Sequence, residues 1–395
     1  MVHPLETIWR KPERLAIGLM SGTSADGVDA ALIRISGHGV DTRVHQEGFS
    51  FLPFTPEQRQ RILTLAEGSS GGAKELCQMS FWLGQLYAEA CLKVCRESGI
   101  SPEQIDFVGS HGQTVYHLPV AEAYLEKDIC GTLQIGEASL IAEALHCPVV
   151  SDFRVRDMAA GGLGAPLVPY TEFLLYRSEE RTVALQNIGG IGNITLLPKG
   201  CPLDAVQAFD TGPGNMVMDA LVSRMTGGKL AYDEGGRLAA EGSVNQQLLH
   251  WMLQDPYLAE KPPKTTGRER YGAGYVEALL RQAERFRVTA EDTLATATHF
   301  TAECIRRAVE DYCRPRPDWL IVGGGGSLNP TLMGHIRQAL PDCRVMVNED
   351  LGLDSNAKEA VAFAILANEC LFASCNNAPG ATGAAHPVVM GKISL

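Results

Sequence analysis

Short apolar runs on either side of a glycine-rich turn open the chain and predict a β-hairpin. The runs 15–20 and 28–35 flank the turn at 21–27, and a third apolar run follows at 44–52. Such runs around a glycine turn are typical of paired strands. Apolar residues then recur at helical spacing over 55–66 and 73–97, which predicts two helices.

The second half of the chain repeats this order of elements. In the first half, strands are also expected at 105–109 and 147–150, and a helix at 136–145. In the second half, strands are expected at 182–187, 193–197, 205–209, 319–322 and 344–347, and helices at 215–225, 294–312 and 356–372. Two halves that each begin with a hairpin and a third strand indicate a duplicated α/β architecture. We therefore expect lobes 1–180 and 181–395 with a central cleft, the final helix being able to pack back on the first lobe. The proline-rich segment 255–270 is expected to be an irregular insertion outside the core.

Composition narrows the class of protein. The 395 residues include 46 acidic and 34 basic side chains, a net charge of −12, which argues against a nucleic-acid binder. No apolar stretch approaches the ~20 residues of a membrane helix, and the N-terminus has no secretory signal pattern. The eleven cysteines form no CxxC pair, which favours reduced thiols. We expect a cytoplasmic protein with no nucleic-acid or membrane partner.

Glycine clusters follow several of the predicted strands. They are Gly22 with Gly27, Gly189 to Gly192, Gly212 with Gly214, and Gly323 to Gly326. In α/β proteins ligands bind beyond the carboxyl ends of strands, where glycine lets backbone N–H groups approach phosphate oxygens. A single glycine cluster after a strand is more often a tight hairpin turn. Four such clusters, each directly after a predicted strand, favour phosphate binding. Neither GxGxxG nor GxxxxGK[ST] occurs, so the pattern indicates a kinase that grips phosphates from both halves.

The chain resembles the anhydro-N-acetylmuramic acid kinases. The matching motifs are Gly18–Asp29, Gly109–Thr114, Thr132–Gly136, Asp152–Asp157, Ala160–Pro166, Asn187–Gly190, Phe209–Asn215, Lys264–Glu269 and Gly323–Gly325. The resemblance implies the two-lobed actin-like ATPase (ribonuclease H-like) fold and a homodimer. It also implies that ATP phosphorylates O6 of 1,6-anhydro-N-acetylmuramic acid while water opens the anhydro bridge. The product would be N-acetylmuramate 6-phosphate, in cell-wall recycling.

Asp210 is the first candidate for the general base that activates water. It ends a predicted strand, precedes a Gly-Pro-Gly turn and matches the catalytic aspartate of the family. The alternative is an N-terminal cap for the following helix. Asp157 and Asp152 are rival bases, and their alternative is an internal salt-bridge cluster.

His111, Thr114, Arg156 and Asp157 are the expected substrate-binding residues. The resemblance assigns a lactyl carboxylate to Arg156, whose guanidinium offers a bidentate fork. Asp157 would orient Arg156 or the sugar hydroxyls. A lone histidine is more often structural, but its motif favours substrate contact for His111, and no second histidine stands at zinc-ligand spacing.

The resemblance also implies residues that bind ATP and Mg²⁺. From the first half these are Gly22, Thr23, Ser24, Ala25, Asp26, Gly27, Val28 and Asp29, and from the second half Gly189, Gly190, Gly323, Gly324 and Gly325. Glu359 is the candidate metal ligand, and its alternative is a favourable charge in the first turn of a helix.

Two positions depart from the family pattern. Leu163 stands where the family usually has glutamine, which puts the sugar specificity in question. Met20 stands where the wider fold often has an aspartate before the first turn, and Asp26 would substitute only if the hairpin geometry allows it. Two other functions therefore stay open: a kinase for another anhydrosugar such as levoglucosan, and a non-catalytic ATP-binding sensor.

Overall fold

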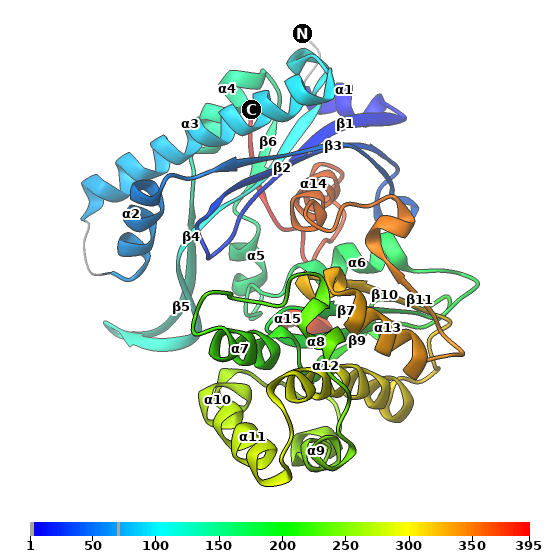
Figure 1. Cartoon of the computed structure of the whole chain (residues 1–395). Helices are drawn as coiled ribbons and strands as arrows, with labels where there is room; N and C mark the ends of the chain where they lie inside the picture. Colours follow the sequence, from blue (N-terminus) through cyan, green and yellow to red (C-terminus); the bar gives the residue numbers. More distant parts are fainter. Residues whose placement is uncertain (1–3, 69–71) are drawn as a thin grey trace. The chain divides into compact units, whose positions relative to one another are not determined.

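Two mixed β-sheets organise the chain (Figure 1). The computed structural model describes residues 4–68 and 72–395. One sheet belongs to unit 1, Met1–Leu175 with Gly352–Leu395, and the other to unit 2, Tyr176–Leu351. Unit 1 therefore combines segments from both ends of the chain, and the C-terminal segment Gly352–Leu395 belongs to it.

The elements follow the predicted order closely. The strands of unit 1 are β1 (Glu13–Ser21), β2 (Gly27–Ser36), β3 (Arg43–Pro53), β4 (Phe107–Tyr124), β5 (Lys127–Ile135), β6 (Val149–Ser151) and β12 (Lys392–Ser394). Its helices are α1 (Pro4–Arg10), α2 (Pro56–Ala66), α3 (Ala73–Ser98), α4 (Ala138–Leu145), α5 (Arg154–Ala159), α6 (Val168–Tyr176, whose last residue opens unit 2), α14 (Lys358–Leu371) and α15 (Pro379–Thr382). Unit 2 contains β7 (Val183–Ile188), β8 (Ile191–Leu197), β9 (Gln207–Pro213), β10 (Trp319–Gly323) and β11 (Arg344–Val347). Its helices are α7 (Asn215–Met225), α8 (Arg237–Glu241), α9 (Gln246–Met252), α10 (Arg268–Tyr271), α11 (Ala273–Phe286), α12 (Ala290–Arg307) and α13 (Pro330–Ala339).

The two sheets share one topology. Unit 1 has the strand order β3-β2-β1-β4-β6, and unit 2 has the corresponding order β9-β8-β7-β10-β11. In unit 1, β1, β2 and β3 pair antiparallel, β4 pairs parallel with β1, and β6 pairs parallel with β4. In unit 2, β7, β8 and β9 pair antiparallel, β10 pairs parallel with β7, and β11 pairs parallel with β10. This repeated order confirms the expected duplicated α/β fold of the actin-like ATPase class.

Two facing glycines let α14 approach the sheet of unit 1. Gly18 of β1 pairs with Gly109 of β4. A Cβ atom on Gly18 would lie 1.8 Å from the Ala360 carbonyl oxygen, and one on Gly109 would lie 2.1 Å from that of Phe363. Only glycine permits such close backbone packing. The helix thus lies directly against β1 and β4 although it comes from the far end of the chain (Figure 1).

The other side chains of β1 face α3. Ile17 and Leu19 belong to the same buried cluster as Leu83 and Tyr87 of α3. The sheet of unit 1 is therefore buried between α3 and α14, which explains why β1 reads as a nearly continuous apolar run.

A long ribbon formed by β4 and β5 was not predicted. The expected strand ended at Gly109, whereas β4 continues to Tyr124 and β5 pairs back along it. Residues 120–130 are all exposed. The paired residues Thr114 and Gln134 lie near the base of the ribbon, where the sheet of unit 1 begins.

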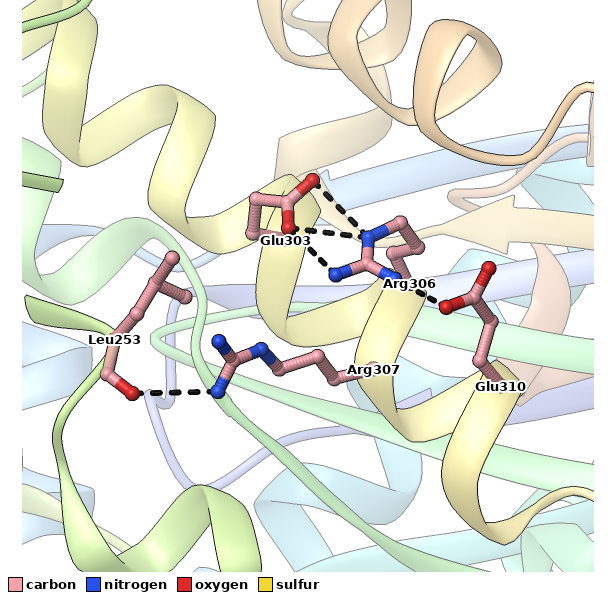
Figure 2. A network of polar contacts seen from close by, with 5 residues as sticks. All are labelled: Leu253, Glu303, Arg306, Arg307 and Glu310. Carbon is pink, nitrogen blue, oxygen red and sulfur yellow. Dashed lines mark hydrogen bonds and ion pairs between the residues drawn. The ribbon is translucent and has the colours of Figure 1, made fainter. Parts of the chain in front are cut away.

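The proline-rich segment contributes to the core of unit 2, which corrects the expectation of an irregular insertion outside it. Tyr257 and Leu258 are buried in the main apolar cluster of that unit. Nearby, Arg306 at the end of α12 donates to Glu303 and Glu310, and Arg307 donates to the Leu253 carbonyl oxygen at 3.2 Å (Figure 2). The Arg307 bond attaches the end of α12 to the end of α9, whereas the Arg306 bonds lie within α12 and the helical turn that continues it.

Candidate functional site

The turn between β1 and β2 is attached to β4 by a glutamine. Gln113 Oε1 accepts a hydrogen bond of 2.6 Å from Ser21 Oγ, and Gln113 Nε2 donates to the Gly22 carbonyl oxygen at 3.1 Å. The Ala25 N–H also donates to the Gly22 carbonyl oxygen at 3.1 Å, and Ala25 has a φ of 49°. The turn is thus a defined loop at the carboxyl end of β1, as phosphate binding requires.

The predicted phosphate-binding residues of this turn differ in exposure. Thr23, Ser24 and Asp26 are exposed, whereas Ala25, Gly27 and Val28 are buried. Ser24 Oγ donates to Asp26 Oδ1 at 3.0 Å. The exposed side chains are available to a ligand, and the buried residues shape the backbone under them.

Carboxylates gather between this turn and the start of α14. Burial, followed by the neighbouring charges of Asp26, Glu359 and Asp354, raises the pKa of Asp29 to about 6. Such mutual repulsion is what a divalent cation relieves. Within residues 4–68 and 72–395, no three His, Cys, Asp or Glu side chains form a complete metal site. Mg²⁺ commonly takes only one or two carboxylates and completes its shell with phosphate and water oxygens, so the group fits that ion.

His111 is neutral and fully engaged within unit 1. Its side chain is only 3% exposed, Nδ1 lies 2.8 Å from the Gly112 carbonyl oxygen, and Nε2 lies 2.9 Å from Arg154 Nε. Arg154 must donate, so His111 Nε2 accepts and Nδ1 carries the proton. Burial and the Arg154 charge lower the pKa of His111 to about 3. Direct substrate contact by His111 stays a prediction, while its visible role is to position Arg154.

Asp157 is completely buried and connects three segments of unit 1. Its Oδ1 accepts hydrogen bonds from Asn377 Nδ2 at 2.8 Å and Thr382 Oγ1 at 2.7 Å. Its Oδ2 accepts one from the Gly164 N–H at 2.9 Å. The carboxylate thus joins α5 to the loop 160–164 and to the C-terminal segment.

The loop 160–164 is fixed at its backbone and presents an apolar side chain. The Leu163 N–H donates to the Thr382 carbonyl oxygen at 2.8 Å, and Arg154 Nη1 donates to the Gly164 carbonyl oxygen at 2.7 Å. The Leu163 side chain is 47% exposed. Arg156 is also exposed, and its guanidinium makes no hydrogen bond or ion pair with the described residues.

Asp152 and Thr114 have other partners. Asp152 forms an ion pair with Lys392, not with either neighbouring arginine, so the expected alternative of a local salt-bridge cluster is wrong for it. Thr114 Oγ1 accepts a hydrogen bond of 3.1 Å from Gln134 Nε2. Gln134 Oε1 is buried and has no partner within the described chain. The motif Thr132–Gly136 marked Gln134 in the sequence but gave it no role.

Glycines from three elements meet at the carboxyl ends of β7 and β10 in unit 2. The Gly214 N–H donates to the Gly190 carbonyl oxygen at 3.0 Å, and the Asn215 N–H donates to that of Gly189 at 2.7 Å. A Cβ atom on Gly324, which has a φ of 79°, would lie 2.8 Å from the Ile188 carbonyl oxygen. The predicted residues Gly189, Gly190 and Gly323 to Gly325 therefore belong to one cluster beside the N-terminus of α7.

Asp210 is half-buried in β9 and is not a helix cap, because α7 begins after Gly214. Its Oδ2 accepts a hydrogen bond of 2.9 Å from the Thr266 N–H, and its Oδ1 accepts none from the described chain. Burial raises the pKa of Asp210 above its ordinary value. The Thr266 N–H and Lys264 oppose this shift, and Glu269 adds to it. A carboxylate with one free oxygen and a raised pKa suits proton abstraction.

The chain matches a known protein family over almost its whole length. A family model described as anhydro-N-acetylmuramic acid kinase matches residues 14–395. The chain belongs to the anhydro-N-acetylmuramic acid kinase family. Curated relatives with the name anhydro-N-acetylmuramic acid kinase include those of Caldanaerobacter subterraneus subsp. tengcongensis, 51% identical over 98% of both chains, and Clostridioides difficile (strain 630), 43% identical over 96% of this chain and 98% of the relative.

The similarity of this kinase-family chain to solved structures is low. Component A of the Acidaminococcus fermentans (R)-2-hydroxyglutaryl-CoA dehydratase is 10% identical, with a TM-score of 0.42 over 89% of this chain and 96% of that one. The ROK hexokinase of Thermus thermophilus is 16% identical, with a TM-score of 0.35 over 90% and 99%. Among the described residues, no helix is long and apolar enough to span a membrane.

Proposed function

We propose that this chain is an ATP-dependent kinase that opens the 1,6-anhydro ring of 1,6-anhydro-N-acetylmuramic acid and phosphorylates O6. The product is N-acetylmuramate 6-phosphate, and the role is peptidoglycan recycling. The observation that carries the proposal is Asp210, a half-buried carboxylate with one free oxygen and a raised pKa. Membership of the family supplies the substrate.

The proposed reaction couples ring opening to phosphoryl transfer. Asp210 accepts a proton from water while the water oxygen bonds to the anomeric carbon. The bond between the anomeric carbon and O6 breaks, and O6 bonds to the γ-phosphorus of ATP. The bond from that phosphorus to the bridging oxygen breaks, which releases ADP. The protein contributes mainly by orienting the reactants and stabilising charge.

Two glycine-rich regions are the proposed contacts for ATP. The turn Gly22–Asp29 supplies exposed hydroxyls and backbone N–H groups, and unit 2 supplies the cluster formed by Gly189, Gly190 and Gly323 to Gly325. Mg²⁺, when bound, neutralises charge on the phosphate oxygens. Glu359 is its proposed protein ligand, supported by its charge beside the half-buried Asp29, whose pKa burial and the charges of Asp26 and Glu359 raise.

Replacing Glu359 by glutamine is expected to raise the Mg²⁺ concentration needed for half-maximal turnover by about tenfold, because one anionic ligand is lost. Titration of Mg²⁺ at saturating ATP measures this change. Glu57→Gln is the matched control, since Glu57 is an exposed acid in the first turn of α2. Equal Mg²⁺ requirements in the two variants would contradict the role of Glu359 as a metal ligand and leave it only the role of a favourable charge in the first turn of α14.

The proposed sugar contacts lie around α5 and the base of the ribbon. Arg156 is exposed and unpaired among the described residues, so its guanidinium is available to a carboxylate of the substrate. His111, Thr114 and Asp157 complete the set proposed from the resemblance. The contacts of Asp157 support a role in orienting the loop 160–164. Leu163 supports a second candidate function, a kinase for levoglucosan, which lacks the lactyl and acetamido groups.

ADP release with MgATP tests these functions on three sugars. We expect turnover with 1,6-anhydro-N-acetylmuramic acid and none with levoglucosan or N-acetylmuramic acid, because only the first has both the anhydro bridge and the lactyl carboxylate. Turnover on levoglucosan instead would make Leu163 a marker of changed specificity. Lack of turnover on all three with ATP still bound would favour a non-catalytic sensor.

The cellular setting and the assembly are part of the same proposal. A cytoplasmic location suits a recycling enzyme that consumes ATP. The homodimer rests on the resemblance, and sedimentation velocity of the purified chain tests it.

A further inference from the structure

Lys264 is a buried cation that the proposed reaction leaves unused. Its side chain is 6% exposed, and its Nζ lies 4.6 Å from the ring centre of Tyr257 and 4.7 Å from that of Tyr312. Nζ also donates to the Tyr257 carbonyl oxygen at 3.2 Å. No carboxylate within the described residues forms an ion pair with it. Burying an ammonium group without a carboxylate partner costs free energy, and contacts with two aromatic faces offset only part of that cost. The buried position of Lys264 therefore suggests a function for its charge.

The segment that Lys264 anchors also holds Asp210. The Asp210 N–H donates to the Lys264 carbonyl oxygen at 3.1 Å, and the Thr266 N–H donates to Asp210 Oδ2 at 2.9 Å. Tyr257 OH donates to the Asp210 carbonyl oxygen at 2.8 Å. Both ends of the segment 257–266 therefore contact the same aspartate, and the Lys264 ammonium sits between the aromatic rings that keep the segment in place.

We propose that Lys264 is a positioning residue for Asp210. The ammonium group anchors the segment that aligns the carboxylate, and its charge favours the ionised form of that carboxylate. This inference rests on the proposed role of Asp210 as the general base.

The charges around the pair give the sign of the expected pH effect. Burial and, to a smaller extent, Glu269 favour the protonated form of Asp210, whereas the Thr266 N–H and, to a smaller extent, Lys264 favour the ionised form. Lys264 itself faces Glu260, Asp311, Cys304 and Asp210. A base works only when deprotonated, so kcat/KM falls as the pH falls through its pKa. Loss of the Lys264 charge raises that pKa and moves the acid limb to higher pH.

The test compares pH profiles of kcat/KM for the full chain and its variants. Lys264→Met is expected to move the acid limb to higher pH, to lower the plateau kcat by about tenfold through misalignment, and to leave KM for ATP unchanged. Lys264→Arg keeps the charge and is expected to restore the limb. Lys261→Met is the matched control, because Lys261 is an exposed lysine on the same segment.

A folded Lys264→Met protein with the wild-type limb and plateau would overturn the inference. If that variant fails to fold, Tyr312→Leu removes one ring from the ammonium and is expected to move the limb in the same direction. A wild-type profile for a folded Tyr312→Leu protein would then overturn it. Turnover by Asp210→Asn would remove the proposed base itself. An inactive Asp210→Asn beside an unaffected Lys264→Met would overturn only the role of Lys264.

Discussion

Asp210→Asn is expected to abolish phosphorylation of the anhydrosugar while ATP binding stays intact. The amide cannot accept the proton from water, and the loss of a general base costs about 10²–10⁴-fold in rate. The hydrogen bond from the Thr266 N–H to Oδ2 can persist to the amide oxygen, so the local fold is preserved. ADP release and calorimetric titration with ATP measure the two properties separately.

Asp204→Asn provides the control for Asp210→Asn. Asp204 is an exposed aspartate just before β9, so the same chemical change there leaves the proposed base untouched. Normal turnover by the control and loss of turnover by Asp210→Asn would place the proton transfer at Asp210. Near-normal turnover by Asp210→Asn would direct attention to Asp157 or Asp152.

Asp157→Ala is expected to destabilise unit 1 by about 3 kcal/mol or more, because it leaves three buried donors without their acceptor. These donors are Asn377 Nδ2, Thr382 Oγ1 and the Gly164 N–H. A loss of that size lowers the melting temperature of a unit of this length by roughly 10 °C. Differential scanning calorimetry measures the change.

The ion pair between Asp152 and Lys392 offers the comparison. Asp152 lies nearer the surface than the buried Asp157, so Asp152→Asn is expected to cost less than about 1 kcal/mol. Equal melting temperatures for Asp157→Ala and the wild type would show that the contacts of Asp157 contribute nothing to stability, and would favour the simpler role of a sugar ligand.

The central strands β1 and β7 were predictable because they are buried on both faces. β1 and β7 read as apolar runs that end at glycine turns, and these features depend only on local sequence. The outer half of β4 could not be predicted in this way. Most of its side chains are exposed, so they show no buried apolar run that would distinguish a strand from a loop.

Candidate site residues could be predicted where they stand in a motif that the local sequence marks. The glycines of the β1–β2 turn and Asp210 each stand at the end of an apolar run. The partners of Asp157 were hidden, since Asn377 and Thr382 come from more than 200 residues further along and carry no periodic signal. Lys264 belongs to the motif Lys264–Glu269, but no role for it followed from that motif. The neighbouring prolines favoured a loop, and sequence alone does not show that two tyrosine rings enclose its ammonium group.

The packing of α14 on Gly18 and Gly109 has a consequence for biosynthesis. Unit 2 is continuous from Tyr176 to Leu351, whereas unit 1 needs residues from both ends of the chain. On the ribosome, β1 and β4 are made long before the helix that covers one of their faces. At about 5–20 residues per second, the roughly 200 residues between β6 and α14 take on the order of 10–40 s to translate. Throughout that interval the face of the unit 1 sheet that α14 covers has no covering helix, so this unit completes its core only after residue 371 has been made.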